Sequence, residues 1–143
     1  MSGQEKKGLE LAEELKKAIF KEYDYYLTLT PENQRYVKRE MSIQPLLYSM
    51  VVASVSDAYK KIGQEQKAYN YLVSSIKPID SRFNSFINQL KAMGKEKAYQ
   101  ESENVQKITP FYQYLFEVMK PYDSTYTSEK TNQITDAVIK ATQ

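Results

Sequence analysis

Carboxylates are the residue type in this chain that could carry general acid–base chemistry. The 143 residues include no His and no Cys, which excludes the usual zinc sites, thiol nucleophiles and Ser-His or Cys-His machinery. The di-iron motif of helical bundles also needs histidine. With only four glycines, the chain has no Gly-rich loop for phosphate. We therefore predict no metal and no cofactor.

The carboxylates do not show the pattern of a catalytic pair. A glycosidase needs two carboxylates a few ångströms apart across a cleft. Glu13, Glu14, Glu101 and Glu103 instead stand among lysines on the polar faces of predicted helices, as solvated surface charges do. We therefore predict that the chain is not an enzyme.

Length and composition indicate a single folded domain over residues 1–143. Hydrophobic residues make up 41% of the chain and charged residues 27%, which argues against disorder. The net charge of +2, spread over interleaved charges, is too small to indicate nucleic acid as a partner. The longest apolar run, residues 46–55, is about half as long as a bilayer-spanning helix. We therefore predict no direct membrane insertion by this segment.

Every long segment has helical periodicity, so we predict an all-α fold. In the helix expected over residues 5–29, apolar side chains recur at three- and four-residue steps: Leu9, Ala12, Leu15, Ile19, Tyr23 and Tyr26. Thr30 and Pro31 are typical of an N-cap and a first helical residue. The helix that follows should run to about Ile62, with a kink or a break near Ile43-Gln44 because of Pro45.

Glycine and proline predict the remaining helix boundaries. Gly63 and Gly94 are expected at helix ends, and Pro78 and Pro121 are expected to stop two further helices. Pro110 is expected to open a helix. With Asp80 and Ser128 as starting residues, the predicted helices span residues 64–76, 80–93, 95–107, 110–120 and 128–141.

Two similar phrases recur at a spacing of about 30 residues, KKIGQEQKAY at 60–69 and KAMGKEKAY at 91–99. Residues 50–78 resemble a tetratricopeptide repeat, a pair of antiparallel helices about 34 residues long. Gly63 matches the turn glycine, and Ser56 and Ala68 match the small positions where the two helices touch. The other matching positions are Val52, Val55, Tyr59, Leu72, Ser75 and Pro78.

The resemblance implies a short array of stacked helical hairpins. The hairpins would span about residues 46–78 and 80–107, with capping helices at 5–29 and 110–141. The second copy matches less well, because Ile87 is bulky where the family has a small residue. In the first hairpin we expect Ala53 and Ser56 to face Ala68 and Leu72.

A second resemblance concerns residues 11–72. The phrase YDYYLTLTPE at 23–32, followed by Lys38-Arg39-Glu40 and the Gly63 motif, is similar to the C-terminal tail of a bacterial membrane-protein family related to protein O-mannosyltransferases. That family has many membrane spans and then a soluble tetratricopeptide-like tail. The resemblance implies a location on the periplasmic face of a bacterial membrane; without it, a cytoplasmic location is expected. The catalytic carboxylates of such enzymes lie in the membrane portion.

The first helix of each tetratricopeptide hairpin lines the concave surface of an array. Carried over by position, this implies candidate partner-binding residues at Met50, Ala53, Asp57, Lys60 and Lys61 in the first copy. In the second copy, Ser81 and the candidates Asn84, Asn88 and Lys91 take these positions. The alternative is that these residues are solvated helix positions.

These features favour a non-catalytic interaction domain that binds a protein or peptide, a partner that could be the membrane portion of its own parent chain. The alternative is a stand-alone small helical protein, such as an immunity or regulatory factor, that blocks one partner.

Overall fold

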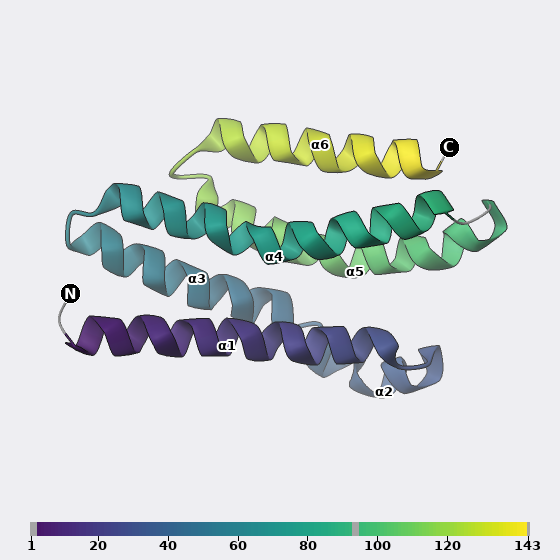
Figure 1. The fold of residues 1–143 in the computed structure, drawn as a ribbon, viewed down its shortest axis with the longest axis horizontal. Coiled ribbons are helices and arrows are strands. Elements are labelled where there is room, and N and C mark those ends of the chain that lie inside the picture. The colour runs from purple at the N-terminus through teal and green to yellow at the C-terminus, as the bar shows by residue number, and fades with distance from the viewer. Residues whose placement is uncertain (1–2, 93–94, 143) are drawn as a thin grey trace. The chain divides into compact units, whose positions relative to one another are not determined.

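The protein is all-α. The computed structural model describes residues 3–92 and 95–142, apart from the side chains of residue 4 and of residues 95–103. Helices occupy nearly all of this part of the chain, joined by short turns (Figure 1). They are α1 (Gly3–Thr28), α2 (Pro31–Met41), α3 (Gln44–Lys61), α4 (Glu65–Ala92), α5 (Lys95–Met119) and α6 (Ser124–Thr142). No helix of the described part is apolar enough over a sufficient length to cross a membrane.

The chain divides into two compact units, Met1–Tyr71 and Leu72–Gln143. The boundary falls inside α4, so the first turns of that helix belong to unit 1 and the remainder to unit 2. Unit 1 therefore contains α1, α2, α3 and the start of α4. Unit 2 contains the rest of α4 with α5 and α6.

In unit 1, α1 packs along α3 through one side of each helix. The buried side of α1 follows the predicted three- and four-residue spacing, from Ala12 through Ile19 and Tyr23 to Tyr26. Phe20 meets Tyr48 of α3 edge to face, with ring centroids 4.8 Å apart. Two positions differ from the prediction: Leu15 is 45% exposed, and Lys16 takes the place on the buried side.

The predicted break between α2 and α3 is confirmed. The Thr30 side chain accepts a hydrogen bond from the Asn33 backbone N–H at 3.2 Å and caps α2. α2 ends at Met41 and α3 begins at Gln44, with Pro45 in its first turn. In the first turn of a helix the backbone N–H has no helical carbonyl as a partner. A proline, which lacks the N–H, therefore starts the new helix without losing a hydrogen bond.

Gly63 ends α3 as predicted, in the left-handed conformation with φ of +78°. Gln64 N–H donates to the Tyr59 carbonyl at 2.9 Å and Gly63 N–H to the Lys60 carbonyl at 3.0 Å, the pair of bonds of a Schellman motif. The chain then reverses into α4. Across this hairpin the Ser56 hydroxyl donates to the Ala68 carbonyl at 3.4 Å, and both residues are fully buried.

The predicted break at Pro78 is wrong, because α4 continues through it from Glu65 to Ala92. An unbroken stripe of buried apolar residues accounts for this: Leu72, Ile76, Ile79, Phe83, Phe86 and Leu90. Their spacing alternates between four and three residues, so one side of a single helix holds them all. A proline inside a helix costs about 3 kcal/mol, whereas each buried side chain of this kind contributes about 1.5–3 kcal/mol. The stripe outweighs the proline.

The predicted break at Pro110 is wrong for the same reason. α5 runs without interruption from Lys95 to Met119, and buried residues again follow at three- and four-residue steps: Val105, Ile108, Tyr112, Leu115 and Met119. α6 also begins earlier than predicted, at Ser124 rather than Ser128, because Asp123 caps it by accepting a hydrogen bond from Tyr126 N–H at 3.0 Å. Gly94, the predicted end of the second hairpin's first helix, lies outside the described residues.

In unit 2, α4 and α5 run antiparallel and α6 packs on α5 (Figure 1). Phe83 of α4 meets Tyr112 of α5 edge to face, with ring centroids 5.8 Å apart. Because Tyr112 lies beyond residue 107, this contact does not test the second hairpin predicted over residues 80–107, which stays a prediction. The separate helices that were predicted to meet at residues 77–80 are a single helix, α4.

Replacing Pro78 by Ala tests the continuity of α4. Alanine supplies the missing backbone N–H and has the best helix propensity, so we expect the free energy of unfolding to rise by about 1–3 kcal/mol. Urea denaturation measures the change, and Pro121→Ala, outside the helices, is the matched control. A loss of stability in Pro78→Ala would contradict a helix that continues through this position.

Candidate functional site

An open apolar groove lies between α1 and α3 in unit 1. Its cavity volume is about 630 Å³, within the usual range for ligand and peptide sites. α1, α3 and the first turn of α4 with the residue before it supply its walls. The lining residues are Glu5, Gly8, Leu9, Leu11, Ala12, Leu15, Val51, Ser54, Val55, Ala58, Tyr59, Lys61, Ile62, Gln64 and Lys67.

Exposed apolar side chains and small residues line the groove together. Leu11 is 57% exposed and Ile62 is 52% exposed, so both remain in contact with solvent. The small lining residues Gly8 and Ala58 are exposed as well. A Cβ placed on Gly8 would meet no atom within 4 Å, which shows that this part of the groove is open.

Charged residues line only one end of the groove. Glu5 lies in the first turn of α1, Lys61 ends α3, and Lys67 lies in the first turn of α4. α1 and α3 run antiparallel, so the start of α1 lies beside the turn that joins α3 to α4 (Figure 1). Beyond this end the lining residues carry no charge.

The candidate binding residues of the first hairpin share the outward side of α3. Met50, Asp57, Lys60 and Lys61 are exposed and Ala53 is half-buried, opposite the side that packs into the core of unit 1. Of these five, only Lys61 lines the groove.

The candidates of the second hairpin lie in unit 2. Asn84, Asn88 and Lys91 are exposed and follow one another on a single face of α4, as their spacing requires. Ser81 is exposed as well. The geometry adds nothing to the selection of these four residues, which rests on their position in the sequence.

The α1 wall of the groove was missed by the sequence analysis, although the sequence carries a signal for it. Gly8, Leu11 and Leu15 follow one another at three- and four-residue steps, beside the stripe that packs into the core. A second signal is the absence of charge between Glu40 and Asp57, which spans most of α3. A helix with apolar residues on more than one side has a further surface to cover.

Lys16 is buried on the packing side of α1, at 8% exposure. Its ammonium donates to the Glu13 carboxylate at 3.3 Å and to the Tyr71 hydroxyl at 3.2 Å, and it lies 4.4 Å from the centre of the Tyr71 ring. The Tyr71 hydroxyl in turn donates to Glu13 at 2.9 Å. Burial lowers the pKa of Lys16 below its ordinary value of 10.5, and the charge of Glu13 partly offsets this.

A second polar cluster joins the helices of unit 2. The Tyr112 hydroxyl of α5 donates to one oxygen of Asp80 on α4, and Lys130 of α6 donates to the other oxygen at 2.9 Å. Burial, together with the hydrogen bond to Asp80 and its charge, raises the pKa of Tyr112 far above its ordinary value of 10.0. The cluster therefore holds three helices together through a neutral tyrosine and an ion pair.

Replacing Lys16 by Met tests the cost of its buried charge. Methionine keeps the length of the side chain and removes the ammonium, so we expect equal or higher stability near pH 7. Between the lowered pKa and 10.5, the unfolded chain binds a proton that the native protein has released, so the stability of the wild type rises with pH relative to the variant.

Chemical denaturation between about pH 7 and pH 11 measures this difference, which follows directly from proton linkage. Glu13→Gln is the matched control, because it leaves the ammonium buried without its carboxylate and should lower stability by about 1 kcal/mol. A difference between wild type and Lys16→Met that does not change with pH would contradict the lowered pKa.

Replacing Tyr112 by Phe tests the cluster of unit 2. Below pH 10 we expect a loss of about 1–2 kcal/mol, because the hydrogen bond to Asp80 disappears. Above pH 10 the unfolded chain ionises its tyrosines while native Tyr112 stays neutral, so the wild type loses stability that Tyr112→Phe does not lose. Melting curves of the two proteins should converge as the pH rises, and those of Tyr114→Phe, an exposed control, should stay parallel to the wild type.

Comparisons with known proteins do not place the chain in a family. No family model, no curated protein and no solved structure matches it. Among the described residues, no three acidic side chains gather into a site that could hold a metal ion. The groove is therefore the feature from which a function can be inferred.

Proposed function

We propose that the chain is a non-catalytic interaction domain that binds a peptide or protein partner in the groove between α1 and α3. The observation that carries the proposal is the exposure of Leu11, Leu15 and Ile62 around one apolar cavity. Single exposed apolar side chains are normal on protein surfaces, but several around one concave cavity are typical of binding sites.

A helical partner suits this shape best. A groove between two helices accepts the apolar side of a third, with anchors at positions i, i+3 or i+4, and i+7. α1 contributes lining residues from Glu5 to Leu15, and α3 with its C-cap residue contributes lining residues from Val51 to Ile62. At 1.5 Å per residue each wall is about 15 Å long, which corresponds to about three helical turns of a partner.

The groove offers little to a chemical reaction. Its titratable residues are Glu5, Tyr59, Lys61 and Lys67, and two of these are lysines on the rim. The groups whose pKa is shifted, Lys16 and Tyr112 among them, do not line the groove. A catalytic site usually brings an acid or base of shifted pKa into its cavity.

The tetratricopeptide-like organisation is part of the proposal. The hairpin of α3 and α4 supports it, through the Gly63 turn and the close contact of Ser56 with Ala68. The unbroken α4 departs from the family pattern, in which separate helices form each repeat. The relation to a membrane-protein tail, and with it a periplasmic location, stays a prediction that the full-length gene would test.

Filling the groove without disturbing the core tests the proposed function. Gly8→Leu places a large side chain in open space, and it should stabilise α1 by up to about 1 kcal/mol because glycine is a poor helix former. We expect it to weaken binding of a leucine-rich amphipathic helical peptide by about tenfold or more, since the cavity is then occupied.

The control is Gly8→Ala, which gives a similar gain in helix stability with only a methyl group added. Methyl NMR spectra of Leu11, Val55 and Ile62 report whether the peptide occupies the groove. Equal affinity for Gly8→Leu and Gly8→Ala would contradict the proposal, and the increased stability of both variants excludes unfolding as the cause of any loss.

A further inference from the structure

We infer that the partner is an amphipathic helix with carboxylates at one end of its apolar stripe, and that these carboxylates meet Lys61 and Lys67. The inference rests on the proposed function and names the chemistry of the partner. It follows from the distribution of charge around the groove.

The two lysines have no acidic partner of their own. Glu5, the third charged residue of the lining, already interacts within the chain. Among the described residues, the side chains of Lys61 and Lys67 form no hydrogen bond and no ion pair, and both residues are exposed. The basic end of the groove is therefore available to an anionic group.

Local helix stability does not explain Lys67. Lys61 lies in the last turn of α3, where a cation interacts favourably with the helix dipole. Lys67 lies in the first turn of α4, where a cation interacts unfavourably with the dipole. Its position at the groove is accounted for if it meets a carboxylate of the partner.

The rest of the groove requires apolar anchors. From Leu9 to Leu15 on α1, and from Val51 to Ala58 on α3, no lining residue is charged. A partner that matches both parts has leucine-type side chains along its stripe and acidic residues beyond one end of it. Such a match of charge sets the direction in which the helix lies and speeds its association.

The openness of the groove favours a helix over an acyl chain with a carboxylate. Leu11 and Ile62 stand at the edges with more than half of their surface exposed. An acyl chain lying between them would itself remain exposed to water along one side. A helix covers both edges with its apolar stripe and turns a polar side to the solvent.

Three designed peptides of about three turns, with the same leucine stripe, test the inference. One carries three glutamates at one end of the stripe, the second three glutamines, and the third three lysines. By fluorescence anisotropy at low salt, we expect the glutamate peptide to bind about tenfold more tightly than the glutamine peptide, and the lysine peptide to bind least. Raising the salt concentration should reduce these differences.

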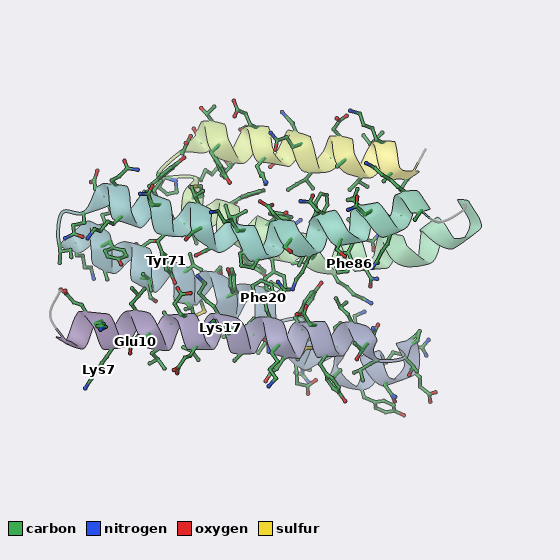
Figure 2. All side chains as sticks on the ribbon, in the orientation of Figure 1. Lys7, Glu10, Lys17, Phe20, Tyr71 and Phe86 are labelled. Atoms are coloured by element: carbon green, nitrogen blue, oxygen red, sulfur yellow. The ribbon has the colours of Figure 1, made fainter. Side chains whose placement is uncertain are left out.

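Charge reversal locates the effect. The double variant Lys61→Glu/Lys67→Glu should invert the order of the glutamate and lysine peptides. The control Lys7→Glu/Lys21→Glu changes the net charge equally at exposed positions of α1 outside the groove, and it should keep the wild-type order. Lys7 points away from α3 into the solvent (Figure 2).

The outcomes separate this inference from the proposed function. If all three peptides bind alike and Gly8→Leu weakens all of them, the inference is wrong and the proposed function stands. If no peptide binds with a Kd below about 1 mM, both the inference and the proposed function are wrong. If none binds but vesicles of phosphatidylglycerol retain the wild type and not Lys61→Glu/Lys67→Glu, the basic end serves a membrane surface and the inference is overturned.

Discussion

The packing of α1 along α3 is the contact on which unit 1 depends. Phe20 and Tyr48 form its aromatic centre, and the buried side of α1 extends the contact in both directions. α1 turns its Leu11 and Leu15 stripe to one edge of this contact, where α3 provides small side chains such as Ser54 and Ala58. The same contact therefore forms the core and leaves the groove beside it. A shift of α1 by one turn would change both at once, since helical neighbours move together.

Lys16 fixes how α1 can lie in this contact. An apolar residue at its position would pack equally well in several registers, whereas an ammonium must reach Glu13 and the Tyr71 hydroxyl. The ion pair is only partly buried, since the Glu13 side chain is 44% exposed, and it contributes little net stability because the lost hydration of Lys16 offsets the attraction. The hydrogen bonds of Lys16 and Glu13 with the Tyr71 hydroxyl tie α1 to the start of α4. Asp80 has the same role in unit 2, where it joins α4, α5 and α6.

The sequence predicted the helices well and their lengths poorly. Local signals were sufficient where one residue decides the outcome, as with the Thr30 cap, the break before Pro45 and the left-handed Gly63. They failed at Pro78 and Pro110, where a local preference competes with a stripe of buried residues on both sides. Of the candidate site, only Lys61 was predicted among the residues that line the groove. The α1 wall was missed because the apolar residues of α1 were assigned to a single face, whereas the helix has a packing stripe and a groove stripe side by side.

The groove is an open surface that the sequence could have closed with small changes. Leu11 and Ile62 remain exposed at the groove, and each such side chain moved out of water would contribute about 1.5–3 kcal/mol to stability. Gly8 also lowers the helix propensity of α1 by about 1 kcal/mol relative to alanine. Natural domains are stable by only about 5–15 kcal/mol, so these two losses are a substantial fraction of the whole. Lys67 adds a third unfavourable choice at the same place, a cation in the first turn of α4. The exposed apolar side chains, the glycine within a helix and the cation at the start of a helix all lie at one cavity. A partner that buries the apolar side chains and brings a negative charge to Lys67 explains the three features together.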